Sequence, residues 1–232
     1  IQKKATAIRT EYYANTLGWG VTDGIQLLPS ANYMEFMEQF REHRAEWQVL
    51  VDEFISQYMQ LKDNAERTLG DMYNESDYPE EHELRSKFAM DMTVLPVPSD
   101  DFRVEIGSDE MERIADEVRT QVEGAYQSSI KEIWQRLYDK VEAMNTKLSD
   151  PKAVFRDTLT ENLSDVCDLL TRMNINDDPD LESIRQQVDS ELARNHPDAL
   201  RNDPIKRREV ADKSKDIMSK MNVFMEGLDG DS

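Results

Sequence analysis

Cysteine, glycine and proline are scarce in this sequence. Its 232 residues include one cysteine, Cys167, with 8 glycines and 8 prolines. A single thiol excludes an internal disulfide framework and a structural zinc site of the Cys-rich kind. Cys167 falls on the face of a predicted helix that carries Leu163 and Leu170, so we expect it to be a core thiol. Because helix breakers are few, long uninterrupted helices are expected.

Basic residues are few relative to acidic ones. The chain has 28 Lys and Arg against 48 Asp and Glu, a formal charge of −20 at pH 7. The only basic cluster, Lys206-Arg207-Arg208, sits among acidic residues. Binding to a phosphate backbone needs a basic surface, so we expect no direct nucleic-acid binding and no binding to anionic membranes. No apolar run of the length needed to span a bilayer is present.

The strong catalytic motifs are absent. The sequence has no Walker A loop, no H-E-x-x-H, no G-x-S-x-G and no kinase signature. None of its histidines follows a glutamate by three residues, which excludes the usual di-iron pattern. Gly18, Gly20 and Gly24 lack a preceding strand and the dinucleotide-binding spacing, so they indicate a structural loop. We therefore expect a non-enzymatic protein without a metal or cofactor.

A first long helix is predicted from residue 31 to residue 69, a stretch without glycine or proline that Gly70 ends. At 1.5 Å per residue it would be roughly 58 Å long. Its apolar positions repeat every seven residues, as in a coiled coil, and only Arg44 interrupts the seam. The two rows are Tyr33, Phe40, Trp47, Phe54, Leu61 and Met37, Arg44, Val51, Tyr58, Ala65.

A second long helix is predicted from residue 108 to residue 148, where apolar residues recur every eleven positions. Two long helices with apolar seams favour an antiparallel, coiled-coil-like hairpin over residues 31–148. Residues 71–107 between them predict a small tip with a short helix. The runs 93–98 and 102–106 indicate a short β-hairpin in it, with the first run as an edge strand because of Pro96 and Pro98.

The remaining segments complete a mainly α fold. Residues 1–30 predict an N-terminal helix and an apolar loop. Residues 149–226 predict a C-terminal helical bundle, because an aspartate-proline pair marks a helix start at Asp150, Asp178 and Asp203. The tail, residues 227–232, is expected to fray.

Six residues are candidates for contact with a partner: Trp19, Leu27, Leu28, Arg44, Trp47 and Trp134. The first three lie in an apolar loop without helical or strand period, and the others lie in the predicted seams. The aromatic rows carry more apolar surface than one facing helix needs, which favours a homo-oligomer, most simply a dimer. The competing interpretation is that the N-terminal loop folds back over the surplus stripe through Leu17, Trp19, Leu27 and Leu28.

Several short motifs resemble an uncharacterised family of phage and mobile-element proteins, a domain of unknown function. They are Thr16-Leu17-x-Trp19, Gly24-x-x-Leu27-Leu28-Pro29-x-x-x-Tyr33, Asn74-Glu75-Ser76-Asp77-Tyr78-Pro79, Leu95-Pro96-Val97-Pro98, Asp101-Phe102-Arg103-Val104 and Trp134-Gln135-Arg136-Leu137-Tyr138. The resemblance brings no catalytic residues. Members tend to be encoded near MoxR-type AAA+ ATPases, which implies such an ATPase as a partner and the host bacterial cytoplasm as the location.

Two functional hypotheses follow. The first is a non-enzymatic phage accessory protein that acts through protein–protein contacts, as an adaptor, a scaffold or a partner of an AAA+ ATPase. The alternative is an acidic mimic of nucleic acid that inhibits a host DNA-binding or defence protein, because rows of carboxylates on a long helix resemble spaced phosphates. A metal-assisted hydrolase with paired carboxylates is a third class, without a motif in its support.

Overall fold

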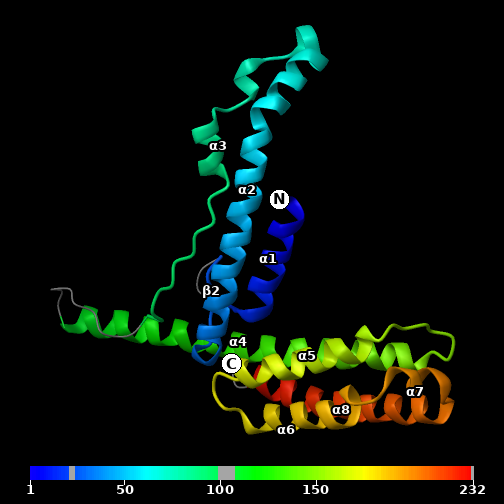
Figure 1. The fold of residues 1–232 in the computed structure, drawn as a ribbon. Coiled ribbons are helices and arrows are strands. Elements are labelled where there is room, and N and C mark those ends of the chain that lie inside the picture. Colours follow the sequence, from blue (N-terminus) through cyan, green and yellow to red (C-terminus); the bar gives the residue numbers. More distant parts are fainter. Residues whose placement is uncertain (21–23, 99–107, 231–232) are drawn as a thin grey trace. The chain divides into compact units, whose positions relative to one another are not determined.

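The computed structural model describes residues 1–20, 24–98 and 108–230, and almost all of its regular structure is helical (Figure 1). The predicted mainly α fold, with long helices and a helical C-terminal region, is confirmed. The elements in chain order are α1 (Gln2–Asn15), β1 (Leu17–Gly18), β2 (Gln26–Leu27), a 3-10 turn (Ser30–Asn32), α2 (Tyr33–Leu69), 3-10 turns (Gly70–Met72 and Glu75–Asp77), α3 (Glu81–Lys87), α4 (Ser108–Ser149), α5 (Thr158–Met173), α6 (Pro179–Gln187), a π-helical turn (Val188–Ala193), α7 (Pro197–Asn202) and α8 (Pro204–Gly230). Among the described residues, no helix combines the length and the apolar character needed to cross a membrane.

The chain divides into two compact units that differ from the predicted segments. Unit 1 comprises Ile1–Ala14 and Met34–Pro96, and unit 2 comprises Asn15–Tyr33 and Val97–Ser232. The long helices α2 and α4 therefore belong to different units, whereas the sequence predicted them as one segment, residues 31–148. The apolar face of α4 packs against α8 and α5. An apolar seam in the sequence indicates that one face of a helix is apolar, but it does not indicate which element packs against that face.

Unit 2 has one large core. It is built around α4, which packs against α8 and α5, and α6 in turn packs against α5 and α8. The π-helical turn after α6 and the short α7 also contribute leucines, Leu192 and Leu200, to this core. The strands β1 and β2 pair antiparallel, with Leu17 opposite Leu27, and both leucines are buried in the same core. The apolar N-terminal loop is therefore part of unit 2.

Two of the three predicted aspartate-proline helix starts are confirmed. The Asp178 carboxylate accepts hydrogen bonds from the amides of Asp180 and Leu181 at the start of α6. Asp203 does the same at the start of α8. The prediction at Asp150 is wrong: Pro151 lies in a turn, in which the Asp150 carboxylate accepts the Lys152 amide, and α5 begins only at Thr158.

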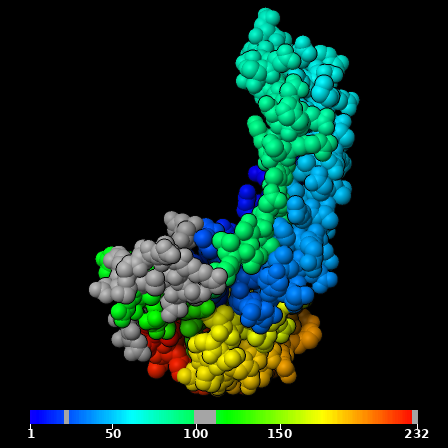
Figure 2. All heavy atoms as spheres, turned by 90° about the vertical axis from the view of Figure 1, so that its left-hand side faces the viewer, coloured from blue at the N-terminus to red at the C-terminus, as the bar shows by residue number. Residues whose placement is uncertain are grey.

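Unit 1 has a small core along α2. Its cluster of buried residues is Val51, Ile55, Tyr58 and Leu84, with Trp47, Phe54, Tyr78 and Phe88 packed against it. The α3 segment runs along α2 in both views (Figures 1 and 2). The Trp47 indole donates to the Phe88 carbonyl at 2.7 Å, and the Tyr58 hydroxyl donates to the Pro79 carbonyl at 2.9 Å. The part of the aromatic seam from Trp47 to Tyr58 is thus covered by residues 78–88, the segment that contains α3.

The end of α2 agrees with the sequence-based prediction, whereas part of the predicted tip does not. Gly70 adopts φ of 52°, the left-handed conformation expected of a glycine that follows a helix. Residues 93–98 form no strand, so this part of the predicted β-hairpin is wrong, because Pro96 and Pro98 remove backbone donors there. Residues 102–106, its other half, lie outside the described residues.

Candidate partner-binding site

Three of the six predicted contact residues are core residues of unit 2. The exposed fractions of Trp19, Leu27 and Trp134 are 7%, 9% and 1%. The Trp134 ring stacks on that of Phe224 with 5.3 Å between centroids, and its indole nitrogen lies 3.4 Å from the Asp178 carboxylate. Because all three side chains are buried in the core of unit 2, their prediction as surface contacts for a partner is wrong.

The other three candidates are more accessible. Leu28 and Trp47 are half-buried. The Arg44 side chain is 61% exposed and forms an ion pair with Asp91 at 3.3 Å, within unit 1. An ion pair this exposed contributes about 0–1 kcal/mol to stability. Arg44 therefore leaves the seam for solvent and does not set its register.

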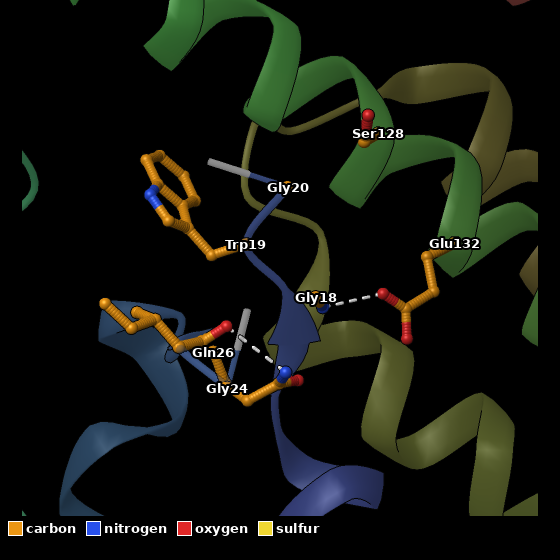
Figure 3. A pocket seen from close by; sticks show the side chains of 8 residues that line it. Gly18, Trp19, Gly20, Gly24, Gln26, Ser128 and Glu132 are labelled. Atoms are coloured by element: carbon orange, nitrogen blue, oxygen red, sulfur yellow. Dashed lines mark hydrogen bonds between the residues drawn. The ribbon is translucent and has the colours of Figure 1, made fainter. Parts of the chain in front are cut away.

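A surface pocket of about 320 Å³ lies beside β1 and β2 (Figure 3). Its walls are the glycine-bearing N-terminal loop and the side of α4 that carries Ser128 and Glu132. Gly24 turns the chain there with φ of 82°. Gly18 approaches α4 so closely that a Cβ atom on it would lie 3.3 Å from the Glu132 carboxylate. The glycines thus serve a structural loop, as predicted.

Glu132, one of the residues that line this pocket, belongs to a hydrogen-bond network. The Glu132 carboxylate accepts the Gly18 amide at 2.7 Å and an Arg136 guanidinium nitrogen at 2.5 Å. Arg136 also donates to the Thr16 carbonyl at 2.6 Å, and the Ser129 hydroxyl donates to the Gly18 carbonyl at 3.1 Å. This network anchors the N-terminal loop on α4.

Apolar side chains on unit 1 form the feature that the sequence analysis missed. Among the described residues, unit 1 buries five apolar side chains: Phe36, Val51, Ile55, Tyr58 and Leu84. It exposes nine large ones: Tyr13, Met34, Val49, Met59, Leu61, Leu69, Met72, Val94 and Leu95. Unit 2 has the opposite balance, with 25 buried residues in its core cluster. The sequence could have indicated this exposed surface, because Met34, Val49 and Met59 are apolar although they lie off both heptad rows.

Part of this exposed surface continues the seam of α2 beyond the small core. The last buried residue of the helix is Tyr58. After it, Leu61, Ala65 and Leu69 follow at four-residue spacing on one helix face, and Met72 follows in the next turn. The exposed fractions of Leu61, Leu69 and Met72 are 48%, 37% and 78%. We call these four residues the distal seam.

Ionisable side chains gather in unit 1, where His43 of α2 contacts Glu11 at 2.5 Å and Lys4 at 3.0 Å, both of α1. No group of three or more His, Cys, Asp or Glu side chains in the described part of the chain is arranged to hold a metal ion. Cys167 is fully buried, as predicted, and its burial raises the pKa of the thiol to about 12. A thiol with that pKa is a poor nucleophile at neutral pH.

The geometry therefore offers an uncovered apolar helix face on unit 1. Comparison with known proteins adds no assignment: no family model, no curated protein and no solved structure matches the chain.

Proposed function

We propose that the protein acts through protein–protein contacts and that unit 1 carries the contact surface. One observation supports this most directly: unit 1 exposes nine large apolar side chains and buries five among its described residues. Apolar surface that a chain does not cover itself is commonly covered by a partner. Unit 2, with its large core, serves as the stable body of the protein.

The residue spacing of the distal seam indicates that the partner contributes a helix. Leu61, Ala65 and Leu69 present an apolar stripe at the spacing by which one helix packs against another. One flank of the stripe carries the uncharged polar side chains Asn64 and Thr68, and the other carries the charged side chains Lys62 and Glu66. A partner helix that carries its own apolar stripe is the proposed ligand.

The proposed partner is a MoxR-type AAA+ ATPase, and the proposed setting is a phage accessory protein in the host bacterial cytoplasm. Both proposals rest on the resemblance of the sequence motifs. Self-association stays a second hypothesis. The homo-oligomer was predicted from the surplus aromatic surface of residues 31–69, and the α3 segment covers most of that aromatic surface. Self-association would therefore have to use the distal seam.

A surface variant with a matched control tests the proposal. Leu61→Glu with Met72→Glu places two charges on the distal seam, where the side chains are 48% and 78% exposed. Ile205→Glu with Val223→Glu makes the same change on unit 2, at side chains 82% and 69% exposed. Biolayer interferometry on the purified ATPase measures binding, and circular dichroism checks the fold.

We expect at least a tenfold loss of affinity for the distal-seam variant and unchanged affinity for the control. Equal affinities for the two variants, or no binding by the unmodified chain, would contradict the proposal. Light scattering on the same samples tests self-association: a dimer that the distal-seam variant dissociates supports it, and a monomer at all concentrations rejects it.

A further inference from the structure

A second pocket lies at the start of α5, in unit 2, and it is independent of the distal seam. Its volume is about 310 Å³. Its walls are Lys147 of α4, residues 154–156 of the connecting segment, and Thr158, Leu159 and Asn162 of α5. Val154 is 90% exposed at the wall, whereas Phe155 is 7% exposed. A valine this exposed can contact a ligand without any change in the packing of the core.

The charged residues that line this α5 pocket are basic, whereas acidic residues outnumber basic ones in the whole chain. Lys147 and Arg156 line it and no carboxylate does, in a chain of charge −20. Neither side chain has a hydrogen bond or an ion pair with any described residue, and the nearest acid in sequence, Asp157, is paired with Arg201. The N-terminus of α5 also borders the pocket, with Asp157 as its N-cap residue and Glu161 in its first turn, but neither carboxylate lines the pocket.

The pocket is held in shape by neighbouring contacts. The guanidinium of Arg207 lies 5.2 Å from the centre of the Phe155 ring, and that of Arg201 lies 5.7 Å from it. Arg207 also donates to the carbonyls of Leu148 and Ala153, at 3.0 and 3.1 Å, on either side of the turn. A site fixed before the ligand arrives spends little of its binding energy on ordering itself.

We propose that the α5 pocket binds an acidic peptide segment of a partner protein that carries one aliphatic side chain. Lys147 and Arg156 would pair with carboxylates of the segment, and its aliphatic side chain would pack on Val154 and Leu159. Charge complementarity selects this ligand over a basic one. Single-stranded nucleic acid fits less well, because it needs exposed aromatic rings on which to stack its bases, and Phe155 is buried.

The test uses the full chain and a fluorescein-labelled probe peptide, acetyl-Asp-Glu-Leu-Asp-Glu-amide, read by fluorescence polarisation. We expect saturable binding that weakens with added salt. Replacing the probe's leucine by alanine should weaken it further. Lys147→Gln and Arg156→Gln should each reduce affinity roughly threefold, as expected for solvated ion pairs. Val154→Asp should reduce it at least tenfold.

Lys140→Gln is the matched control, because Lys140 is an exposed lysine on the same helix, and it should leave affinity unchanged. The proposal fails if the probe does not bind, or if Lys140→Gln weakens binding as much as Lys147→Gln. It also fails if a labelled oligothymidine binds more tightly than the peptide and responds to the same variants. None of these outcomes bears on the distal seam, which lies in the other unit.

Discussion

Replacing Arg207 should destabilise unit 2 far more than its place in a basic cluster suggests. Its guanidinium donates to the carbonyl of Lys147 at 2.7 Å, of Leu148 at 3.0 Å, of Asp150 at 2.6 Å and of Ala153 at 3.1 Å. The first two belong to the last turn of α4, whose carbonyls have no partner within the helix. Arg207 therefore caps α4 and fixes the turn that follows it.

The magnitude follows from these contacts. Arg207→Met keeps the length and the apolar stem of the side chain but removes every donor. A hydrogen bond from a charged donor contributes about 1.5–3 kcal/mol, and water can replace the donor at the exposed carbonyls. The contact with the Phe155 ring adds about 0.5–1 kcal/mol. We therefore expect a loss of about 2–3 kcal/mol, which lowers the Tm of a unit of this size by roughly 4–12 °C.

Differential scanning calorimetry measures this effect, with Arg208→Met as the control. Arg208 is the exposed neighbour of Arg207 and has no hydrogen bond or ion pair with a described residue, so its replacement should change stability by less than about 0.5 kcal/mol. If the two variants melted at the same temperature, the capping role of Arg207 would be refuted.

Three further outcomes are expected in unit 2. The Cys167 thiol, with its pKa raised to about 12 by burial, should stay unreactive toward Ellman's reagent at pH 8 and react fully in denaturant; rapid reaction of the native chain would contradict its burial. Hydrogen bonds from Arg185 and Gln186 lower the pKa of Glu182 from 4.5 to about 2. Glu182 therefore stabilises the fold above its ordinary pKa and loses this effect as pH falls toward 2, so thermal melts of Glu182→Gln and the unmodified chain should differ at pH 6 and converge near pH 2. Trp134→Ala should cost about 3–5 kcal/mol in urea unfolding, and a loss below 1 kcal/mol would show that the ring is not enclosed as described.

Local signals predicted helices well. The stretch without glycine or proline matches α2, which ends at Leu69 before Gly70 as expected. The predicted helix over residues 108–148 matches α4, Ser108–Ser149. Helix starts at Asp178 and Asp203 were visible because an aspartate cap and a following proline act within one turn. Asp150-Pro151 shows the limit of this signal, since the same pair also suits a turn.

Tertiary pairing and burial were not visible in the same way. The seams of α2 and α4 have similar lengths, yet α4 is covered by α8 and α5, and α2 by the α3 segment. An aromatic residue in a seam, such as Trp134, has the same sequence pattern whether it meets a partner protein or the chain's own core. The distal seam was hidden for the converse reason: Leu61 continues a row whose earlier members are covered, and only the structure shows where the cover ends.

Hydrogen–deuterium exchange of the chain, alone and bound to the MoxR-type ATPase, tests the central claim most directly. Because unit 1 has few buried residues, amides of α2 around the distal seam should exchange faster in the free chain than those of α4 around Trp134, which is 1% exposed. In the complex, protection should rise over residues 58–72 and stay unchanged in the core of unit 2. Protection confined to unit 2, with residues 58–72 exchanging as fast as in the free chain, would contradict the account.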